Sequence, residues 1–149
     1  MDEPESIQRL TYRIREIDGP KHSDILAKLH QRTFGDSAEQ PDVSRGHWWL
    51  VYYEKEPIAF AGLTPSQLGF NCGYLKRVGV LPAHRGNGLQ RRLVRVREAR
   101  ARRNGWKRVI TDTTENVPSA NSLIRAGYRM FRPTHGWAFN DTLYWTKTL

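Results

Sequence analysis

The junction between residues 74–80 and residues 88–103 constrains this chain more than any other stretch. The first segment, Tyr-Leu-Lys-Arg-Val-Gly-Val, has the composition of a strand and ends just before Pro82. An Arg-Gly-Asn-Gly turn then opens a helical segment that stops at Asn104-Gly105. The expected stripe on one face of this helix is Leu89, Leu93, Val96 and Arg100. A strand that runs through a glycine turn into a long helix predicts a sheet with helices packed on it.

The other segments repeat this mixture of strand and helix patterns. Alternating or continuous apolar residues predict strands, and apolar residues at helical spacing, the second helix capped by Ser119, predict two further helices. The expected strands are 10–17, 48–54, 58–63, 108–114, 128–132 and 143–148; the helices are 22–34 and 119–126; the main loops are 35–46 and 65–73. The order predicts an α/β (α+β) domain with a central sheet.

Several classes of protein are excluded by simple counts. The 149 residues predict one domain spanning 1–149, with residues 1–9 as a flexible leader. The longest apolar run, residues 48–53, is too short to cross a bilayer, and the acidic start is no secretory signal. A single cysteine, Cys72, forms neither an intramolecular disulfide nor a multi-thiolate metal site. We therefore expect a cytoplasmic protein with no membrane partner and no metal.

The formal charge of +9 is concentrated in the second half of the chain. Residues 43–149 contain eighteen bases and six acids, and ten of those bases lie between Arg85 and Arg108 with Glu98 as the only acid. Such a block is either a solvated helix face or the contact surface for a polyanion, whether nucleic acid or a phosphorylated small molecule.

The glycine turn favours a small phosphorylated ligand. Gly86 and Gly88 allow backbone N–H groups to approach an anion without a Cβ in the way. The helix N-terminus adds unpaired N–H donors and a partial positive charge. Arg85, Arg91 and Arg92 surround the turn, which suits a pyrophosphate. The plainer interpretation is an ordinary connection that the glycines tighten; a P-loop is excluded because no Gly-Lys-Ser/Thr follows.

The stretch Val-Gly-Val-Leu-Pro-Ala-His-Arg-Gly-Asn-Gly-Leu, residues 78–89, resembles the acetyl-coenzyme A loop of the GNAT superfamily of N-acetyltransferases. Arg85 and Gly88 match the loop motif, whereas Gln90 stands where that family has Gly or Ala. A second stretch, which contains Asn116, Ser119, Leu123, Gly127 and Tyr128, is similar to the family's motif after its fifth strand. The order of elements from about residue 10 to residue 148 agrees as well.

The resemblance implies a mixed, mostly antiparallel sheet of six to seven strands, splayed between strands 4 and 5 and flanked by three to four helices. It implies acetyl-coenzyme A as donor, with the pantetheine against the fourth strand and the pyrophosphate on the loop amides. The implied cofactor-binding residues are Val78, Gly79, Val80, Arg85, Gly86, Asn87, Gly88, Leu89, Gln90, Arg91, Asn116 and Ser119. It also implies direct transfer to an amine without an acyl-enzyme, which fits a Cys72 that has no histidine near it in the sequence.

The catalytic groups are less well marked. The Val80 N–H is the implied donor to the thioester carbonyl, and the tyrosine that serves many relatives as general acid is replaced by Leu123. The candidate catalytic residues are Asp112, Glu115, Asn116 and Ser122, with His47, His135 or a water chain as other candidate bases.

Two other functions stay open beside an N-acetyltransferase. One is a coenzyme A-binding protein of the same fold without catalysis, suggested by Leu123 and Gln90. The other is a basic nucleic-acid-binding module, which does not need glycines at this spacing. The acceptor is an amine on a small molecule or on a protein or peptide, and a homodimer is compatible with the sequence.

Overall fold

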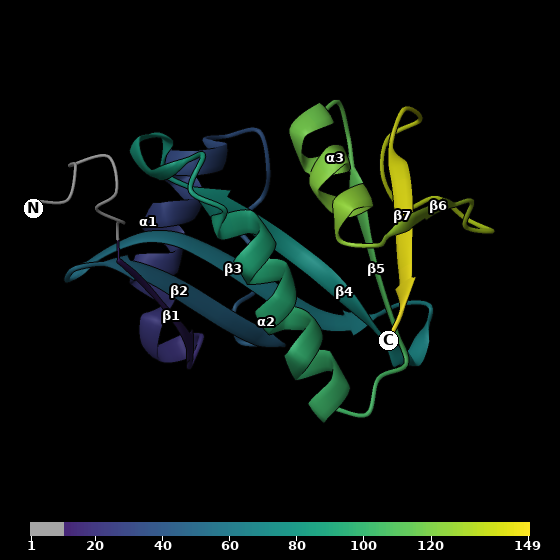
Figure 1. Ribbon diagram of the computed structural model, residues 1–149, viewed down its shortest axis with the longest axis horizontal. Helices are drawn as coiled ribbons and strands as arrows, with labels where there is room; N and C mark the ends of the chain where they lie inside the picture. The colour runs from purple at the N-terminus through teal and green to yellow at the C-terminus, as the bar shows by residue number, and fades with distance from the viewer. Residues whose placement is uncertain (1–10) are drawn as a thin grey trace, which may run out of the picture.

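The computed structural model describes residues 11–149, which form a seven-stranded mixed sheet with three α-helices (Figure 1). The strands lie side by side in the order β1-β2-β3-β4-β5-β7-β6. Their bounds are β1 Tyr12–Ile17, β2 His47–Tyr53, β3 Glu56–Ser66, β4 Gly69–Val80, β5 Arg108–Thr113, β6 Arg129–Phe131 and β7 Leu143–Thr148. The helices are α1 Ser23–Phe34, α2 Leu89–Arg103 and α3 Val117–Arg125, with short 3₁₀ turns η2 Pro20–His22 and η3 Pro82–His84. The predicted α/β class is therefore confirmed; the expected leader lies outside the described residues.

The sheet divides where β4 meets β5. This is its one parallel pairing, and it joins only residues 72–74 of β4 to residues 108–110 of β5. Beyond these pairs β4 continues to Val80 and β5 to Thr113 without bonding to each other, and Figure 1 shows the two strands diverging. The expected splay between the fourth and fifth strands is present. It leaves one edge of β4 open in the interior of the molecule.

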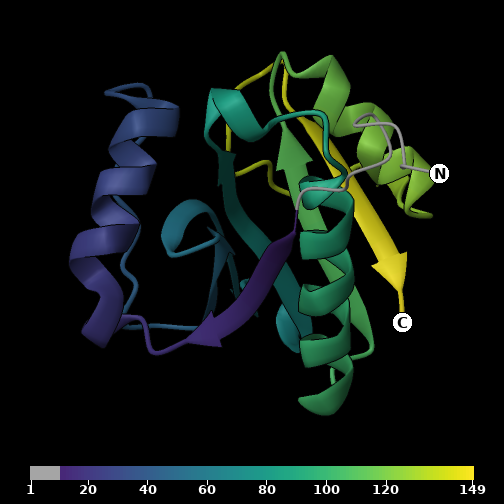
Figure 2. The same cartoon turned by 60° about the vertical axis from the view of Figure 1, so that its left-hand side comes forward.

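Helices cover both faces of the sheet (Figure 2): α1 lies on one face, and α2 and α3 lie on the other. The central strands are buried because β2 and β3 carry almost continuous apolar residues, including Trp48, Leu50 and Phe60, each no more than 1% exposed. Burial of such side chains is worth about 1.5–3 kcal/mol each. No helix within residues 11–149 is both long and apolar enough to span a bilayer.

The structure corrects the expected stripe of α2. Leu89 and Leu93 are buried as predicted, but the stripe continues through Arg97 and Ala101 instead of Val96 and Arg100. Arg97 is buried because its guanidinium finds two carbonyl acceptors: Nε donates to the Leu93 carbonyl at 3.0 Å, and Nη1 donates to the Gly62 carbonyl at 3.2 Å. A buried charge is tolerated when its donors are satisfied.

Two element boundaries also differ from the predictions. The expected loop 65–73 is a tight hairpin, because β3 extends to Ser66 and β4 begins at Gly69; the Ser66 hydroxyl accepts the Leu68 N–H at 2.8 Å. Helix α3 starts at Val117 rather than at Ser119. Its cap is Asn116, whose side-chain oxygen accepts the Ser119 N–H at 3.1 Å.

Candidate functional site

The turn before α2 has the backbone that its glycines predict. Gly86 and Gly88 lie in the left-handed region with φ of 80° and 72°, where other residues are strained. A Cβ built on either one meets no heavy atom within 4 Å, so both glycines face open space. The Asn87 side chain braces the turn by donating to the His84 carbonyl at 3.0 Å. The glycines therefore serve the shape of the turn and leave its outer surface clear.

Helix α2 begins without a cap. Gly88 supplies no side-chain cap, and the first intrahelical bond runs from the Arg92 N–H to the Gly88 carbonyl at 3.1 Å. The amides of Leu89, Gln90 and Arg91 consequently have no acceptor within the described chain. Free N–H groups with the positive end of a 15-residue helix form a site that favours an anion.

Three arginines lie around the turn: one braces it, and two carry charges that no acid neutralises within residues 11–149. Arg85 donates from Nε to the Val80 carbonyl at 3.0 Å, which ties the turn to the end of β4. Arg91 and Arg92 are exposed beside the helix start and make no ion pair within residues 11–149. Their charges stay available to a ligand with several phosphate groups.

The open edge of β4 presents backbone groups to the splay. The Leu81 N–H donates to the Ile58 carbonyl of β3 at 3.0 Å. Because alternate residues of an antiparallel strand bond to the same neighbour, Val78 and Val80 direct their N–H and C=O groups away from β3. A bulge with Arg77 at a φ of 43° precedes them. Gly79 is required here because a Cβ would lie 2.5 Å from Thr33 Oγ1 of α1.

On the opposite side of the splay, Asp112 of β5 is fixed by two donors. The Tyr74 hydroxyl donates to Asp112 Oδ2 at 2.6 Å, and the Trp137 indole N–H donates to the same oxygen at 2.9 Å. Burial and the neighbouring Asp112 raise the pKa of the Tyr74 hydroxyl well above its ordinary value, so the tyrosine stays protonated and donates. This clamp joins β4, β5 and the segment between β6 and β7, just beyond the last β4–β5 pair.

The other predicted catalytic residues lie apart from this clamp. Glu115 is exposed at a φ of 49°, and Asn116 uses its side-chain oxygen to cap α3. Ser122 is partly buried on α3, and its hydroxyl makes no hydrogen bond within the described residues. Leu123, where a tyrosine was expected by resemblance, is 7% exposed and packs in the core. Tyr128 is buried, and its hydroxyl donates to Glu98 at 2.7 Å.

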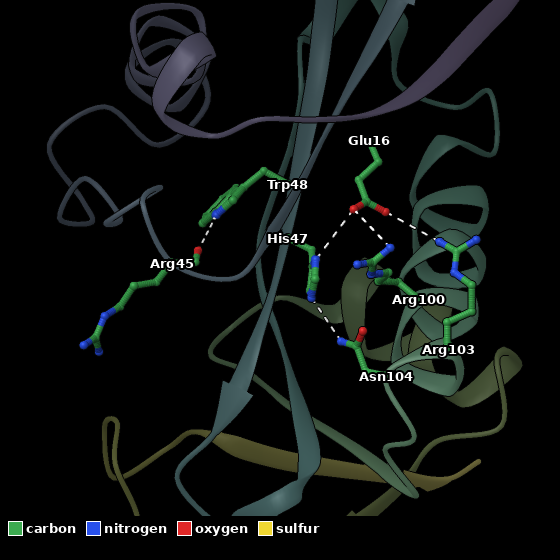
Figure 3. A network of polar contacts seen from close by, with 7 residues as sticks. All are labelled: Glu16, Arg45, His47, Trp48, Arg100, Arg103 and Asn104. Atoms are coloured by element: carbon green, nitrogen blue, oxygen red, sulfur yellow. Dashed lines mark hydrogen bonds and ion pairs between the residues drawn. The ribbon is translucent and has the colours of Figure 1, made fainter.

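His47 belongs to a polar network at the far end of α2 from the turn (Figure 3). It lies at the start of β2, 3.6 Å from the Glu16 carboxylate and 3.0 Å from the side-chain amide of Asn104, which caps the far end of α2. A helix of 15 residues is about 22 Å long, which separates His47 from Gly88. Burial, with a contribution from Arg100, lowers the pKa of His47. The network fastens β1 and β2 to α2.

The remaining candidate groups do not form a reactive cluster. His135 is exposed in the segment between β6 and β7, and Cys72 is buried in β4. Among the residues that the structure describes, no group of three His, Cys, Asp or Glu side chains is placed to hold a metal ion. A cavity of about 680 Å³ lies between β6, β7 and their connection; Phe131, Phe139 and Leu143 line it, and no predicted site residue does.

Sequence reasoning missed Tyr74 and Trp137 as site residues. Tyr74 resembles any aromatic residue of a strand, and Trp137 lies 25 residues beyond Asp112 in a loop of no regular pattern. The only available signal was a tryptophan in a mostly polar segment.

Comparisons with known proteins agree with this geometry. The acetyltransferase (GNAT) family matches residues 11–128. An uncharacterised N-acetyltransferase of Escherichia coli (strain K12), YjgM, is 34% identical over 80 residues, which cover 52% of this chain and 48% of that protein. The match thus spans about half the length of this curated relative.

Solved structures share the fold at low sequence identity. An IAA acetyltransferase from Bacillus cereus has a TM-score of 0.75 at 16% identity, over 93% of this chain and 100% of that one. A Bacillus subtilis acetyltransferase in complex with CoA has a TM-score of 0.75 at 14% identity, over 93% of this chain and 99% of that one.

Proposed function

The chain belongs to the GNAT family of acetyltransferases, and we propose on this basis that it transfers an acetyl group from acetyl-coenzyme A to a primary amine. The observation that carries the proposal is the uncapped start of α2 behind two left-handed glycines, at the end of a strand whose edge is open. An anion site that directly follows an unpaired strand edge suits a ligand with a pyrophosphate and an amide-bearing arm.

The residues fit such a donor. The amides of residues 86–91 would hold the pyrophosphate, with Arg85, Arg91 and Arg92 nearby, and the outward-facing groups of Val78 and Val80 would pair with the pantetheine. Gln90 is partly buried, and its backbone N–H has no acceptor within the described residues. The N–H therefore stays free for the donor although the side chain is larger than the Gly or Ala of the family motif. Asn116 already caps α3, and this competes with its proposed contact to the donor.

The reaction needs an uncharged amine and a polarised carbonyl. Bound acetyl-coenzyme A supplies an activated thioester. The Val80 N–H, which is directed into the splay, would donate to the carbonyl oxygen as negative charge develops there. The amine nitrogen forms the new C–N bond, the C–S bond breaks, and the thiolate leaves. One proton must pass from the amine to a base or to water.

Among the predicted bases, we assign Asp112 as the group that faces the acceptor amine. Its position is fixed by Tyr74 and Trp137, whereas Glu115 is exposed and Ser122 lacks a partner to activate it within the described residues. With Leu123 at the position of the usual acid, the thiolate departs without a protein proton donor there.

A thiol-release assay with acetyl-coenzyme A and a panel of amines and peptides tests the proposal, with coenzyme A binding measured first by thermal melts. Transfer that increases from pH 6 to pH 9 is expected, because the acceptor amine must lose its proton. Binding without transfer to any acceptor would establish the non-catalytic alternative. No binding of coenzyme A, together with salt-dependent binding of DNA or RNA, would establish the nucleic-acid alternative.

A further inference from the structure

Asp112 is an unusual carboxylate in a protein with a charge of +9. Of the six acidic residues after residue 42, Glu98 pairs with Lys147 at 3.1 Å, and four are exposed: Glu54, Glu56, Glu115 and Asp141. Asp112 alone is partly buried without a cation, because no basic side chain between residues 11 and 149 comes within ion-pair distance of it. Partial burial of a carboxylate without a countercharge is unfavourable, so its presence calls for a partner.

The clamp leaves one oxygen of Asp112 available. Both donors, Tyr74 and Trp137, bond to Oδ2. Oδ1 receives no hydrogen bond from the described residues, and it is not among the polar atoms that are sealed from solvent. Two neutral donors on one oxygen fix the orientation of the carboxylate without neutralising its charge.

Aromatic rings surround this carboxylate. The Tyr74 and Trp137 rings meet edge to face at 6.5 Å between centroids, and the Trp137 and Tyr144 rings do so at 4.5 Å. Tyr144 lies directly opposite Asp112 in the β5–β7 register, so both side chains stand on the same face of the sheet. The Tyr144 hydroxyl also accepts the Ala138 N–H at 3.1 Å, which holds the Trp137 segment in place. Aromatic rings next to a carboxylate favour an organic cation.

We propose that Asp112 Oδ1 binds the acceptor amine in its alkylammonium form, before that amine gives up a proton and attacks as the neutral nucleophile, with Tyr74 and Trp137 as the positioning residues of that carboxylate. The inference rests on the proposed function for the identity of the ligand as acceptor, and it specifies the acceptor as a cationic amine rather than a neutral aryl amine or an acidic molecule. Lys76, whose Nζ lies 5.9 Å from the Tyr74 ring centroid, is an internal competitor near this carboxylate and makes no ion pair with Asp112.

The test measures binding directly, with n-butylammonium as the probe and n-butanol as its uncharged counterpart. The Trp137 indole N–H resonance, assigned by its loss in Trp137→Phe, reports occupancy in the full chain. Butylammonium should shift this resonance saturably and butanol should not. Asp112→Asn, which keeps the shape but removes the charge, should raise the Kd for butylammonium by about tenfold or more. Asp141→Asn removes the same charge from an exposed position near β7 and should change the Kd less than twofold.

A second variant separates positioning from stability. Tyr74→Phe keeps the ring and removes the hydroxyl that donates at 2.6 Å, so it should weaken butylammonium binding about three- to tenfold while the thermal shift with coenzyme A stays unchanged. Equal Kd values for the parent and Asp112→Asn, or equal binding of butanol, would overturn the inference. If coenzyme A binding or transfer fails while charge-dependent amine binding persists, the proposed function is wrong and the cation site stands.

Discussion

Replacing Gly88 with valine separates the cost of a left-handed backbone from the loss of donor binding. Gly88 has a φ of 72°, and a Cβ there meets no heavy atom within 4 Å, so the folded protein accommodates the side chain sterically. The remaining cost is conformational, about 1–2 kcal/mol or more for a residue other than glycine. For a chain of 149 residues each kcal/mol lowers the Tm by about 2–4 °C. Gly88→Val should therefore fold with a moderately reduced Tm.

Gly105→Val is the matched control, because Gly105 has a φ of 78°, has equally open surroundings and lies at the other end of α2. The two variants should lose similar stability. Coenzyme A at one hundred times its Kd should add about 2.7 kcal/mol to the parent and to Gly105→Val, a rise of about 5–11 °C in a fluorescence melt. Gly88→Val should show no rise, because the side chain occupies the space of the pyrophosphate. An equal rise in both variants would refute the assigned site.

Three further predictions concern the acid position, a buried histidine and a partly buried ion pair. Leu123→Tyr should accelerate thiol release, by up to about 10²-fold, if the ring reaches the leaving group; an unchanged kcat in a folded variant would show that no acid is limiting. Burial, with a contribution from Arg77, lowers the pKa of His30, so the unfolded chain takes up its proton first as the pH falls below about 6.5 and stability decreases. His30→Phe should flatten this dependence of Tm between pH 7 and pH 5, and an unchanged slope would contradict the assignment. Glu98→Gln leaves Lys147 without its carboxylate at 3.1 Å and should lower the free energy of unfolding by about 1–3 kcal/mol in urea titrations, whereas no loss would show that the pair is energetically neutral.

The parts of the fold that follow from local pattern were predictable. The strand, glycine turn and helix around Gly88 are determined by neighbouring residues, and resemblance to a known loop predicted the splay beside them. The errors arose where distant contacts decide. Arg97 is buried on α2 because carbonyls of Leu93 and Gly62 accept its donors, and no helical periodicity contains that information. The hairpin at residues 66–69 escaped prediction because Pro65 and two glycines suggested a loop.

The candidate site divides along the same line. Its donor half lies within one continuous stretch, residues 78–91, so the resemblance of that stretch to a known loop was sufficient to propose it. Its acceptor half joins Tyr74, Asp112 and Trp137 from three separate segments. Only the pairing of β4 with β5 and the return of β7 beside β5 bring these side chains together. The sequence could therefore name Asp112 as one candidate among several, but it could not predict the two hydrogen bonds that fix its carboxylate.

The missing acid at residue 123 and the fixed carboxylate of Asp112 together indicate which step of the transfer depends most on the protein: departure of the thiolate or placement of the amine. A coenzyme A thiolate has a pKa near the ~8.5 of a free cysteine, so it leaves at neutral pH without an acid, though more slowly than with one, and a leucine at residue 123 need not abolish the reaction. The acceptor is the harder partner, since an amine in water is protonated and unoriented. Holding a reactant in place is worth far more than one proton donor, because effective molarities for well-oriented groups reach about 10⁵ M or higher. A site that lacks the acid but fixes the carboxylate of Asp112 with two hydrogen bonds therefore depends on placing the amine. Variants of Tyr74 and Trp137 should then raise KM for the amine more than they lower kcat.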